Sequence, residues 1–549
     1  MTGIVPLTGL DHPSLVNGQD VVSDRHVYTV DSRAFLEDVL GSVRLKRELE
    51  QGLVDPATVT GRVVGRCALA GPDVVRDALK AAAAAAPVWA ASPLRNRLDG
   101  MARIREEIRL RHVELVDLLI AEGSPRRLAE WQVAGVLATC SEETLSWCAE
   151  QMSREFTVGP RRVLLRRVAD GVVCVNPPQN APTAGALFGC LALVAGNAVV
   201  IRAPRSAPLG VMHVLREIIA PVLADAGAPP GTLNVFCSRP GVALDAWIAS
   251  PLVDDVLYVG GVERGQEIER RCVESGKKPI LELSGNDCVV VWHDADLDLA
   301  VEALCESFYG SGQICMVPNQ VVVHPRVADE LLARLDTALA DVRPGYPDEP
   351  NALLSPVLRT EKFFAFVTEA LEHGARLVRG TRRLEVDGTP SETGMFLEPT
   401  VLRIDGLEGC RRIRMVGEET FFPLLPVVVP DDITEGVDED VLLDRVIEFV
   451  NSNRYGLRNS LWSGDDRVVD EFVRRVGNGG ILKVNDSHIG FVPYLPTHGG
   501  TGLTGGVFGE ANYPALRTSH LQGVSIASGV RPSEAVFEAY RRMVGESQH

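Results

Sequence analysis

The stretch from Pro279 to Asn319 reads PILELSGNDCVVVWHDADLDLAVEALCESFYGSGQICMVPN, and it decides how the rest of the chain is interpreted. It contains a carboxylate, Glu282, at the end of a short apolar run, and a thiol, Cys315, after a glycine-rich turn. Between them, residues 296–309 carry apolar side chains at helical spacing, which predicts a helix. If the fold brings the thiol and the carboxylate together, they form a nucleophile with a base. A lone cysteine is more often a small buried apolar residue, so this hypothesis needs support from elsewhere in the chain.

Length and composition limit the classes of protein that this chain can belong to. With 549 residues, it is too long for one hydrophobic core and should form two or three domains. The net charge of −18 and the lack of a Lys/Arg cluster argue against a nucleic-acid partner. The eleven cysteines show neither a CxxC pair nor Cys/His zinc spacing, so we expect no metal site and a reducing, cytoplasmic location.

Membrane insertion is also not expected. The N-terminus has neither a basic nor an apolar region of the kind that a signal peptide needs. The most apolar run, residues 184–201, is interrupted by Gly196 and Asn197, which fits a buried helix followed by a buried strand.

The order of the predicted elements indicates an α/β protein. After a predicted hairpin at residues 158–175, strands and helices alternate to about residue 286, and a second alternating series begins near residue 289. This pattern predicts parallel sheets that are covered on both faces. Residues 1–60 are hard to place, although residues 32–53 carry apolar side chains at helix-like spacing, which ends at Asp55-Pro56.

Several short motifs elsewhere in the chain accompany the Cys315 stretch, each weak on its own. They are Pro178–Pro182, Gly196–Arg202, Tyr258–Gly265, Glu418–Pro423, Tyr455–Leu457 and Val484-Asn485. In this order and at these separations, the set resembles the aldehyde dehydrogenase superfamily over about residues 60–525.

The resemblance implies a fold with a Rossmann-type cofactor domain, an α/β catalytic domain and a β-arm for oligomerisation. The predicted segments are an N-terminal extension (1–60), an NAD(P)-binding domain (61–157 and 176–288), a catalytic domain (289–497), arms (158–175 and 510–526) and a C-terminal tail (527–549). The arms imply a homodimer or homotetramer, and an exposed half-apolar hairpin suits strand pairing between subunits.

Several family signatures are altered in this chain. Gln179 and Ala181 replace a Trp and an aromatic residue, Ser284-Gly285-Asn286 replaces Gly-Gly-Lys, Phe422 replaces a Gly, Thr497-His498-Gly499-Gly500 replaces Pro-Phe-Gly-Gly, and the Lys often found between Asn180 and Arg202 is absent. These departures leave the family assignment intact, but they argue against a common aldehyde as the substrate.

The resemblance also implies a role for each catalytic residue. Cys315 corresponds to the nucleophile, and we expect neighbouring backbone N–H dipoles to lower its pKa. Asn180 corresponds to the oxyanion donor, together with the backbone N–H of Cys315. Glu282 corresponds to the base that activates water to hydrolyse the thioester. Because relatives that transfer the acyl group to coenzyme A usually lack this carboxylate, Glu282 favours release of a free acid.

The cofactor is expected to be NADP or NAD. Gly260, Gly261 and Gly265 form the turn that would admit the pyrophosphate to a helix N-terminus. Glu419 and Phe421 match positions around the nicotinamide riboside, and Arg202 stands where the family has a Lys for the adenosine ribose. NAD-preferring relatives often carry Glu at the position of Arg205. A guanidinium there can pair with a 2′-phosphate, which predicts a preference for NADP.

The substrate channel is predicted from aromatic and small residues near the nucleophile: Gly185, Phe188, Tyr309, Ile314 and Met316. This set indicates a roomy apolar tunnel for an aromatic or medium-length aliphatic aldehyde. Two alternatives remain open, namely a coenzyme A-acylating enzyme of the same fold and a non-catalytic homologue.

Overall fold

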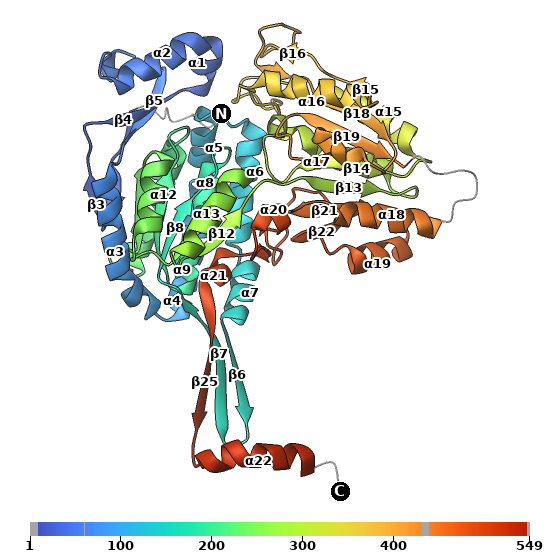
Figure 1. Cartoon of the computed structure of the whole chain (residues 1–549). Coiled ribbons are helices and arrows are strands. Elements are labelled where there is room, and N and C mark those ends of the chain that lie inside the picture. Colours follow the sequence, from blue (N-terminus) through green and yellow to red (C-terminus); the bar gives the residue numbers. More distant parts are fainter. Residues whose placement is uncertain (1–8, 60, 431–438, 546–549) are drawn as a thin grey trace.

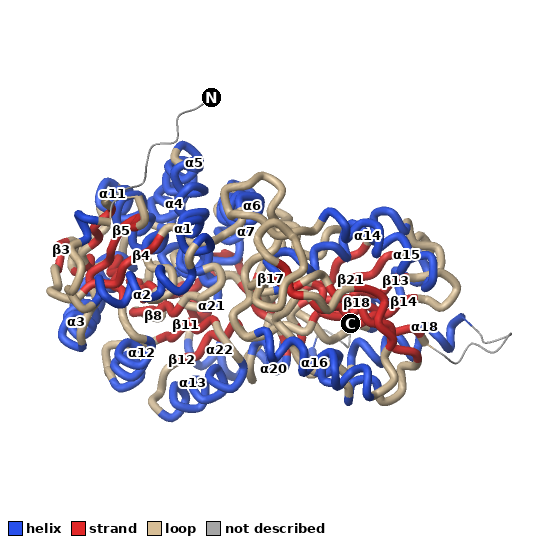
Figure 2. Tube along the Cα trace, turned by 90° about the horizontal axis from the view of Figure 1, so that it is seen from above, coloured by secondary structure: helices blue, strands red, loops and turns tan. Residues whose placement is uncertain are grey.

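The computed structural model of the chain describes residues 9–59, 61–430 and 439–545. Two seven-stranded sheets dominate the molecule, and a three-stranded arm projects from it (Figure 1). Seen from above, helices lie on both sides of the strands in each half of the molecule (Figure 2). The α/β class with parallel sheets that the sequence predicts is therefore confirmed.

The first sheet has the strand order β12-β11-β8-β9-β10-β2-β3. Its five parallel strands are β8 (Val172–Asn176), β9 (Ala198–Ala203), β10 (Leu233–Cys237), β11 (Asp255–Val259) and β12 (Lys278–Glu282). The chain order reverses between β8 and β11, and ligands of open α/β sheets bind beyond the carboxyl ends of the strands at such a point.

Alternation along these strands explains why both faces of the sheet are covered. On β8, Val173 and Val175 belong to one core cluster, and Val172 and Cys174 belong to another. The first cluster includes residues of α4 (Leu94–Leu110), α5 (His112–Ala121), α6 (Arg126–Thr139), α8 (Pro182–Gly189) and α10 (Leu209–Val214). The second includes residues of α3 (Pro72–Ala90), α12 (Pro240–Ala249) and α13 (Val262–Glu274). Successive side chains of a strand point to opposite faces, so a sheet buried on both sides is apolar throughout.

The described part of residues 1–60 is built into the fold and is not a separate extension. The hairpin of β2 (Ser14–Val16) and β3 (Gln19–Val21) joins the first sheet at β10. Strands β1 (Leu10–His12) and β4 (His26–Val30) both pair with β5 (Val63–Ala68). Two helices, α1 (Ser32–Glu37) and α2 (Val39–Glu50), follow at the top of Figure 1. These strands are three to five residues long, too short to give a period-2 signal in the sequence.

The second sheet has the order β15-β18-β19-β14-β13-β21-β22. Its members are β13 (Asp287–Val291), β14 (Pro318–Val323), β15 (Arg376–Arg379), β18 (Thr400–Asp405), β19 (Leu424–Val429), β21 (Arg458–Trp462) and β22 (Ile481–Val484). Only residues 283–286 separate β12 of the first sheet from β13 of the second. Glu282 therefore lies where the two sheets meet.

The helix predicted over residues 296–309 is shorter in the structure. Helix α14 (Leu297–Cys305) passes into a 3₁₀ segment, η3 (Glu306–Gly312), in which Tyr309, Gly310 and Ser311 leave helical conformation. Asp296 caps α14 by accepting hydrogen bonds from the backbone N–H groups of Asp298 and Leu299.

The projecting arm consists of β6 (Ser153–Val158), β7 (Arg161–Ala169) and β25 (Ser519–Ala527), all antiparallel. Its bounds differ from the predicted ones, because residues 172–176 form β8 of the first sheet. Helix α22 (Pro532–Gly545) lies across the far end of the arm (Figure 1). Among the described residues, no helix is both long and apolar enough to cross a membrane.

Candidate active site

A cavity of about 520 Å³ lies at the junction of the two sheets. Cys315, Glu282 and Asn180 all line it, although they come from three separate segments of the chain. Glu282 ends β12, Asn180 lies between β8 and α8, and Cys315 lies between η3 and β14. The fold thus brings the predicted nucleophile, base and oxyanion donor to one cavity.

The loop that leads to Cys315 is held in an unusual backbone conformation. Gly310, Ser311 and Gly312 have φ values of 60°, 59° and 67°. A Cβ on Gly312 would lie 2.2 Å from the carbonyl oxygen of Phe422, so only glycine fits there. Ser311 is not glycine and lies in the left-handed region, at a cost of about 1–3 kcal/mol. Its hydroxyl donates to Ser355 O (2.6 Å) and accepts from Ser355 N (3.0 Å), which holds the strained residue in place.

The thiol of Cys315 does not have the lowered pKa that we expected from the sequence. Burial, together with the carboxylates of Glu419, Asp287 and Glu282, raises its pKa to about 12, and Arg458 acts in the opposite direction. Three carboxylates outweigh one buried guanidinium, because each disfavours a second negative charge nearby. The prediction of a low pKa is therefore wrong for this structure.

This raised pKa leads to a prediction for alkylation of Cys315. Below pH 12 the thiolate fraction, and with it the rate of modification by iodoacetamide, should rise about tenfold per pH unit. Glu282→Gln removes one carboxylate that raises the pKa, so alkylation at a given pH should become faster. Mass spectrometry of the Cys315 peptide between pH 7 and 9 measures both effects. A rate that levels off below pH 8 would contradict the prediction.

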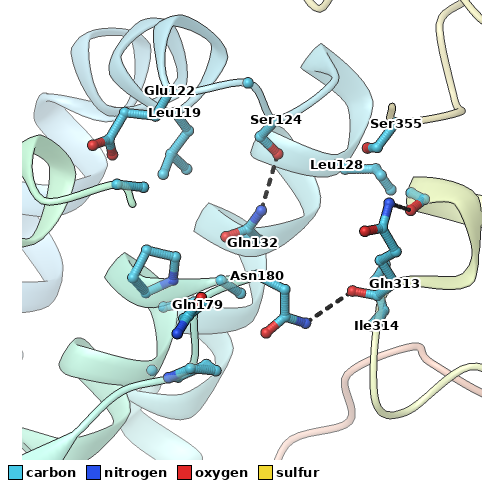
Figure 3. A pocket seen from close by; sticks show the side chains of 18 of the residues that line it. Leu119, Glu122, Ser124, Leu128, Gln132, Gln179, Asn180, Gln313, Ile314 and Ser355 are labelled. Atoms are coloured by element: carbon cyan, nitrogen blue, oxygen red, sulfur yellow. Dashed lines mark hydrogen bonds between the residues drawn. The ribbon is translucent and has the colours of Figure 1, made fainter. Parts of the chain in front are cut away.

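Asn180 and Glu282 are held by contacts around the cavity. The side-chain amide of Asn180 donates to Gln313 O at 2.9 Å, on the loop that carries Cys315 (Figure 3). One carboxylate oxygen of Glu282 accepts from the backbone N–H of Gly499 at 2.5 Å. Gly499 belongs to the segment Thr497–Gly500 that replaces the usual Pro-Phe-Gly-Gly, so the altered motif still supplies a donor that orients Glu282.

Four of the five residues predicted for the substrate channel line this cavity: Gly185, Phe188, Ile314 and Met316. Tyr309 does not. It lines a separate cavity with Arg127 and Cys305, because the chain leaves helical conformation at this residue. A Cβ on Gly185 would lie 2.4 Å from Pro178, so this glycine permits close packing of α8 on the loop before it.

Much of the cavity wall was not found from the sequence. One face of α6 contributes Leu128, Trp131, Gln132, Gly135, Val136 and Thr139 at helical spacing. Phe491 stacks on Trp131 with ring centroids 5.2 Å apart, and His498 lies against Phe188 at 4.1 Å. Burial lowers the pKa of His498 to about 3, so its imidazole is neutral. The helical period of α6 predicts a buried face, but it gives no indication that part of this face lines a cavity.

The carboxyl edge of the first sheet fits a dinucleotide. Helix α13 begins after Gly261 without any side-chain cap, which leaves its first backbone N–H groups for an anion. A Cβ on Gly261 would meet nothing within 4 Å, whereas one on Gly265 would lie 2.3 Å from Leu283. Gly265 thus allows close packing of α13 on the sheet, and the space beside Gly261 lies open to a ligand. A Cβ on Gly260 would lie 2.6 Å from the Tyr258 hydroxyl.

Arg202, near the end of β9, and Arg205, two residues beyond that strand, have different surroundings. Arg202 is only 2% exposed, and its guanidinium donates to Asn176 Oδ1 (2.8 Å) and Ser238 O (3.2 Å). Its guanidinium is therefore enclosed at the edge of the sheet. A residue that binds the adenosine ribose, as we expected of Arg202 from the sequence, would face an open cleft. Arg205 is partly exposed and donates to the carboxylate of Glu50 on α2 at 3.0 Å.

Glu419 and Phe421 lie on the loop before β19. Glu419 accepts from the backbone N–H of Gly285 at 3.2 Å, and burial raises its pKa to about 7. Phe421 is half-buried and has a φ of 59°, which is strained for an aromatic residue. The fold brings Glu419 to the 283–286 connection that follows Glu282, but neither residue lines the main cavity.

Lys46 and Glu50 are further residues that the sequence did not reveal. Lys46 lines the main cavity, and Glu50 pairs with Arg205. Both belong to α2, in the region that carries no recognisable motif, so only the tertiary structure places them near the site.

Comparison with known proteins gives one clear family. The sequence profile of the aldehyde dehydrogenase family matches residues 46–519. A vanillin dehydrogenase of Pseudomonas fluorescens is 29% identical over 482 residues, which are 84% of this chain and 93% of that protein. A benzaldehyde dehydrogenase [NAD(+)] of Pseudomonas putida is 28% identical over 495 residues, which are 88% and 94%. Relatives named for NAD and for NADP both occur.

The fold also matches solved structures. An NAD-dependent aldehyde dehydrogenase from Sinorhizobium meliloti superimposes with a TM-score of 0.79 at 23% identity and covers 97% of this chain and 98% of that one. At this level of identity the match supports the architecture described above.

Proposed function

Because the chain belongs to the aldehyde dehydrogenase family and is an NAD(P)-dependent oxidoreductase that acts on aldehydes, we propose that Cys315, Asn180 and Glu282 carry out its reaction. The observation that carries this proposal is that the three side chains line one cavity beside the dinucleotide-binding edge of the first sheet. The net reaction converts an aldehyde, water and NAD(P)+ to a carboxylic acid, NAD(P)H and a proton.

The sequence of steps follows from the chemistry of the three groups. The thiolate of Cys315 adds to the aldehyde carbon, and the oxyanion of the resulting thiohemiacetal accepts hydrogen bonds from Asn180 and the Cys315 backbone N–H. NAD(P)+, when bound, accepts the hydride that leaves this carbon. The thioester that remains on Cys315 is attacked by water, whose proton passes to Glu282. The thiol is then released with the acid.

The hydrogen bond from Gly499 to Glu282 supports hydrolysis over acyl transfer to coenzyme A. A base has to be oriented toward its water molecule, and this contact restrains the carboxylate at the cavity wall. An acyl-transfer enzyme has no use for a base at this position, so the placement of Glu282 favours a free acid as the product.

We further propose an aromatic or medium-length apolar aldehyde as the substrate. Trp131, Phe188 and Phe491 give the cavity flat apolar surfaces, and about 520 Å³ is a volume typical of small-molecule sites. His498 and Gln132 add neutral polar groups to the same wall. Vanillin and benzaldehyde, the compounds for which two relatives are named, are both aldehydes on an aromatic ring, and vanillin also carries polar ring substituents.

The decisive experiment follows reduced-cofactor absorbance with the purified protein, NAD or NADP, and a panel of aldehydes. We expect turnover with benzaldehyde and its hydroxylated derivatives, and little with charged or two-carbon aldehydes. Product formation should not require coenzyme A. A reaction that proceeds only with coenzyme A would replace hydrolysis by acyl transfer, and reaction of charged aldehydes alone would overturn the substrate class.

Asn180→Ala tests the oxyanion role. Loss of this donor should lower kcat by roughly 10²–10³-fold, because the hydrogen bond strengthens as negative charge develops on the oxygen. The affinity for the aldehyde should change little. Gln179→Ala removes a neighbouring amide that also lines the cavity, and it should affect KM more than kcat. Equal losses in both variants would mean that Asn180 only shapes the loop.

The arm supports assembly into a homodimer or homotetramer. Leu521 and Ile526 on β25, Phe156 on β6, and Phe537 and Tyr540 on α22 are exposed apolar side chains on one projecting element. Large apolar side chains that are exposed on a projecting element favour an interaction surface there. The double substitution Phe537→Asp and Tyr540→Asp should lower the mass of the assembly in solution, as measured by light scattering.

The eleven free cysteines support a reducing, cytoplasmic location.

A further inference from the structure

We propose that Lys46 and Glu50 on α2 set the selectivity of this protein between NAD and NADP, an inference that rests on the proposed function. Glu50 forms the carboxylate that disfavours a 2′-phosphate, and Lys46 acts with Arg205 to favour one. The specificity site would thus be assembled from the N-terminal segment and the end of β9.

The topology puts Arg205 at the position where dinucleotide-binding sheets recognise the adenosine ribose. Strand β9 is the second strand of the unit β8–α8–β9. In dinucleotide-binding sheets, an acidic residue near the end of the second strand binds the 2′-hydroxyl, and an arginine there accommodates the 2′-phosphate. This chain has both groups at that place, with the arginine on the strand side and the carboxylate on α2.

The two partners leave polar atoms unsatisfied. Glu50 accepts from Arg205 through Oε2 at 3.0 Å, while Glu50 Oε1 and Arg205 Nε are both buried and make no hydrogen bond with the residues that the structure describes. An unpaired buried polar atom carries a desolvation penalty unless a ligand or water satisfies it. A ribose hydroxyl can donate to the free carboxylate oxygen, and a phosphate can accept from the free Nε.

Lys46 lies one helical turn before Glu50 on the same side of α2, so both side chains point toward β9. It lines the cavity together with Ser206 and Ala207, the residues directly after Arg205. Its ammonium makes no hydrogen bond or ion pair with any residue in the described ranges, and burial lowers its pKa. The nearby Glu50 carboxylate acts against this lowering. A cation that lies near Arg205 and makes no direct ion pair with a described residue is suited to an anionic ligand.

The position of α2 is fixed independently of this contact. Leu45 and Leu49 on its buried face form a small core cluster with Tyr28 of β4. Ahead of it, Arg33 of α1 makes a bidentate ion pair with Asp348 (2.9 and 3.0 Å) and lies over the Tyr346 ring. Substitution of Lys46 or Glu50 should therefore leave the helix in place.

The test compares 5′-AMP with 2′,5′-ADP, which differ only in the 2′-phosphate. Isothermal titration with the full-length protein measures both dissociation constants without any catalytic step. Glu50→Gln should lower the dissociation constant of 2′,5′-ADP about tenfold, because it removes the repelling charge and frees Arg205. The same variant should slightly raise the dissociation constant of 5′-AMP. Lys46→Gln should weaken 2′,5′-ADP about tenfold and leave 5′-AMP within about twofold. Both effects should shrink as salt is added.

Exposed residues of the same two helices provide matched controls. Glu37→Gln and Arg47→Gln remove one charge of each sign, and neither should change the ratio of the two dissociation constants. If Glu50→Gln and Lys46→Gln weaken the binding of both nucleotides equally and lower the melting temperature, the two residues only stabilise the position of α2, and the inference is wrong. An unchanged ratio also overturns it. If the wild type binds neither nucleotide, the proposed cofactor site itself fails.

Discussion

Cys315→Ala should abolish aldehyde oxidation, with a loss in kcat on the order of 10⁶-fold, because it removes the thiol that we propose as the nucleophile of the covalent intermediate. The variant should still bind NAD or NADP, since Gly260, Gly261 and Gly265, which are proposed to admit the pyrophosphate, lie at the start of α13 and not on the loop that carries Cys315. Reduced-cofactor absorbance measures the first effect and isothermal titration the second.

Cys305→Ala is the matched control for this result. Cys305 lies ten residues earlier on α14, is buried, and lines only the second cavity. Its loss should change the rate by no more than a few-fold. Substantial turnover in Cys315→Ala would mean that another group is the nucleophile, and equal loss in both variants would point to damage in the fold of this segment.

Glu282→Gln should separate the two halves of the reaction. Addition of Cys315 and departure of the hydride do not need the carboxylate, whereas hydrolysis does, so one equivalent of reduced cofactor should form rapidly. Steady-state turnover should then fall by roughly 10²–10⁴-fold. The glutamine oxygen can still accept the hydrogen bond from Gly499, so the side chain keeps its place.

The intermediate itself can be observed in this variant. Intact-protein mass spectrometry after mixing with cofactor and aldehyde should show the mass of one acyl group, removed by hydroxylamine. Glu302→Gln, an exposed carboxamide substitution on α14, should show neither burst nor adduct. Unchanged steady-state turnover in Glu282→Gln, without a burst, would remove Glu282 from the mechanism and reopen the coenzyme A reaction.

The sequence by itself determined the class of fold and the three residues proposed for catalysis. Local patterns carry this information: apolar runs of five or six residues such as those of β8 and β13 specify buried strands, and the turn before Cys315 has glycine where φ is positive. Motif order then related Asn180, Glu282 and Cys315 to one another before any distance was known.

Only the tertiary structure decided which electrostatic environment these residues experience. The raised pKa of Cys315 arises first from burial and then from Glu419, Asp287 and Glu282, which converge through the junction of two sheets. The pairing of Arg205 with Glu50 joins residues 155 positions apart, and Tyr309 leaves the cavity because the chain departs from helical conformation there. Propensity and period act over a few residues, whereas charge–charge contacts and cavity walls depend on how distant elements pack, and that packing has no local signature in the sequence.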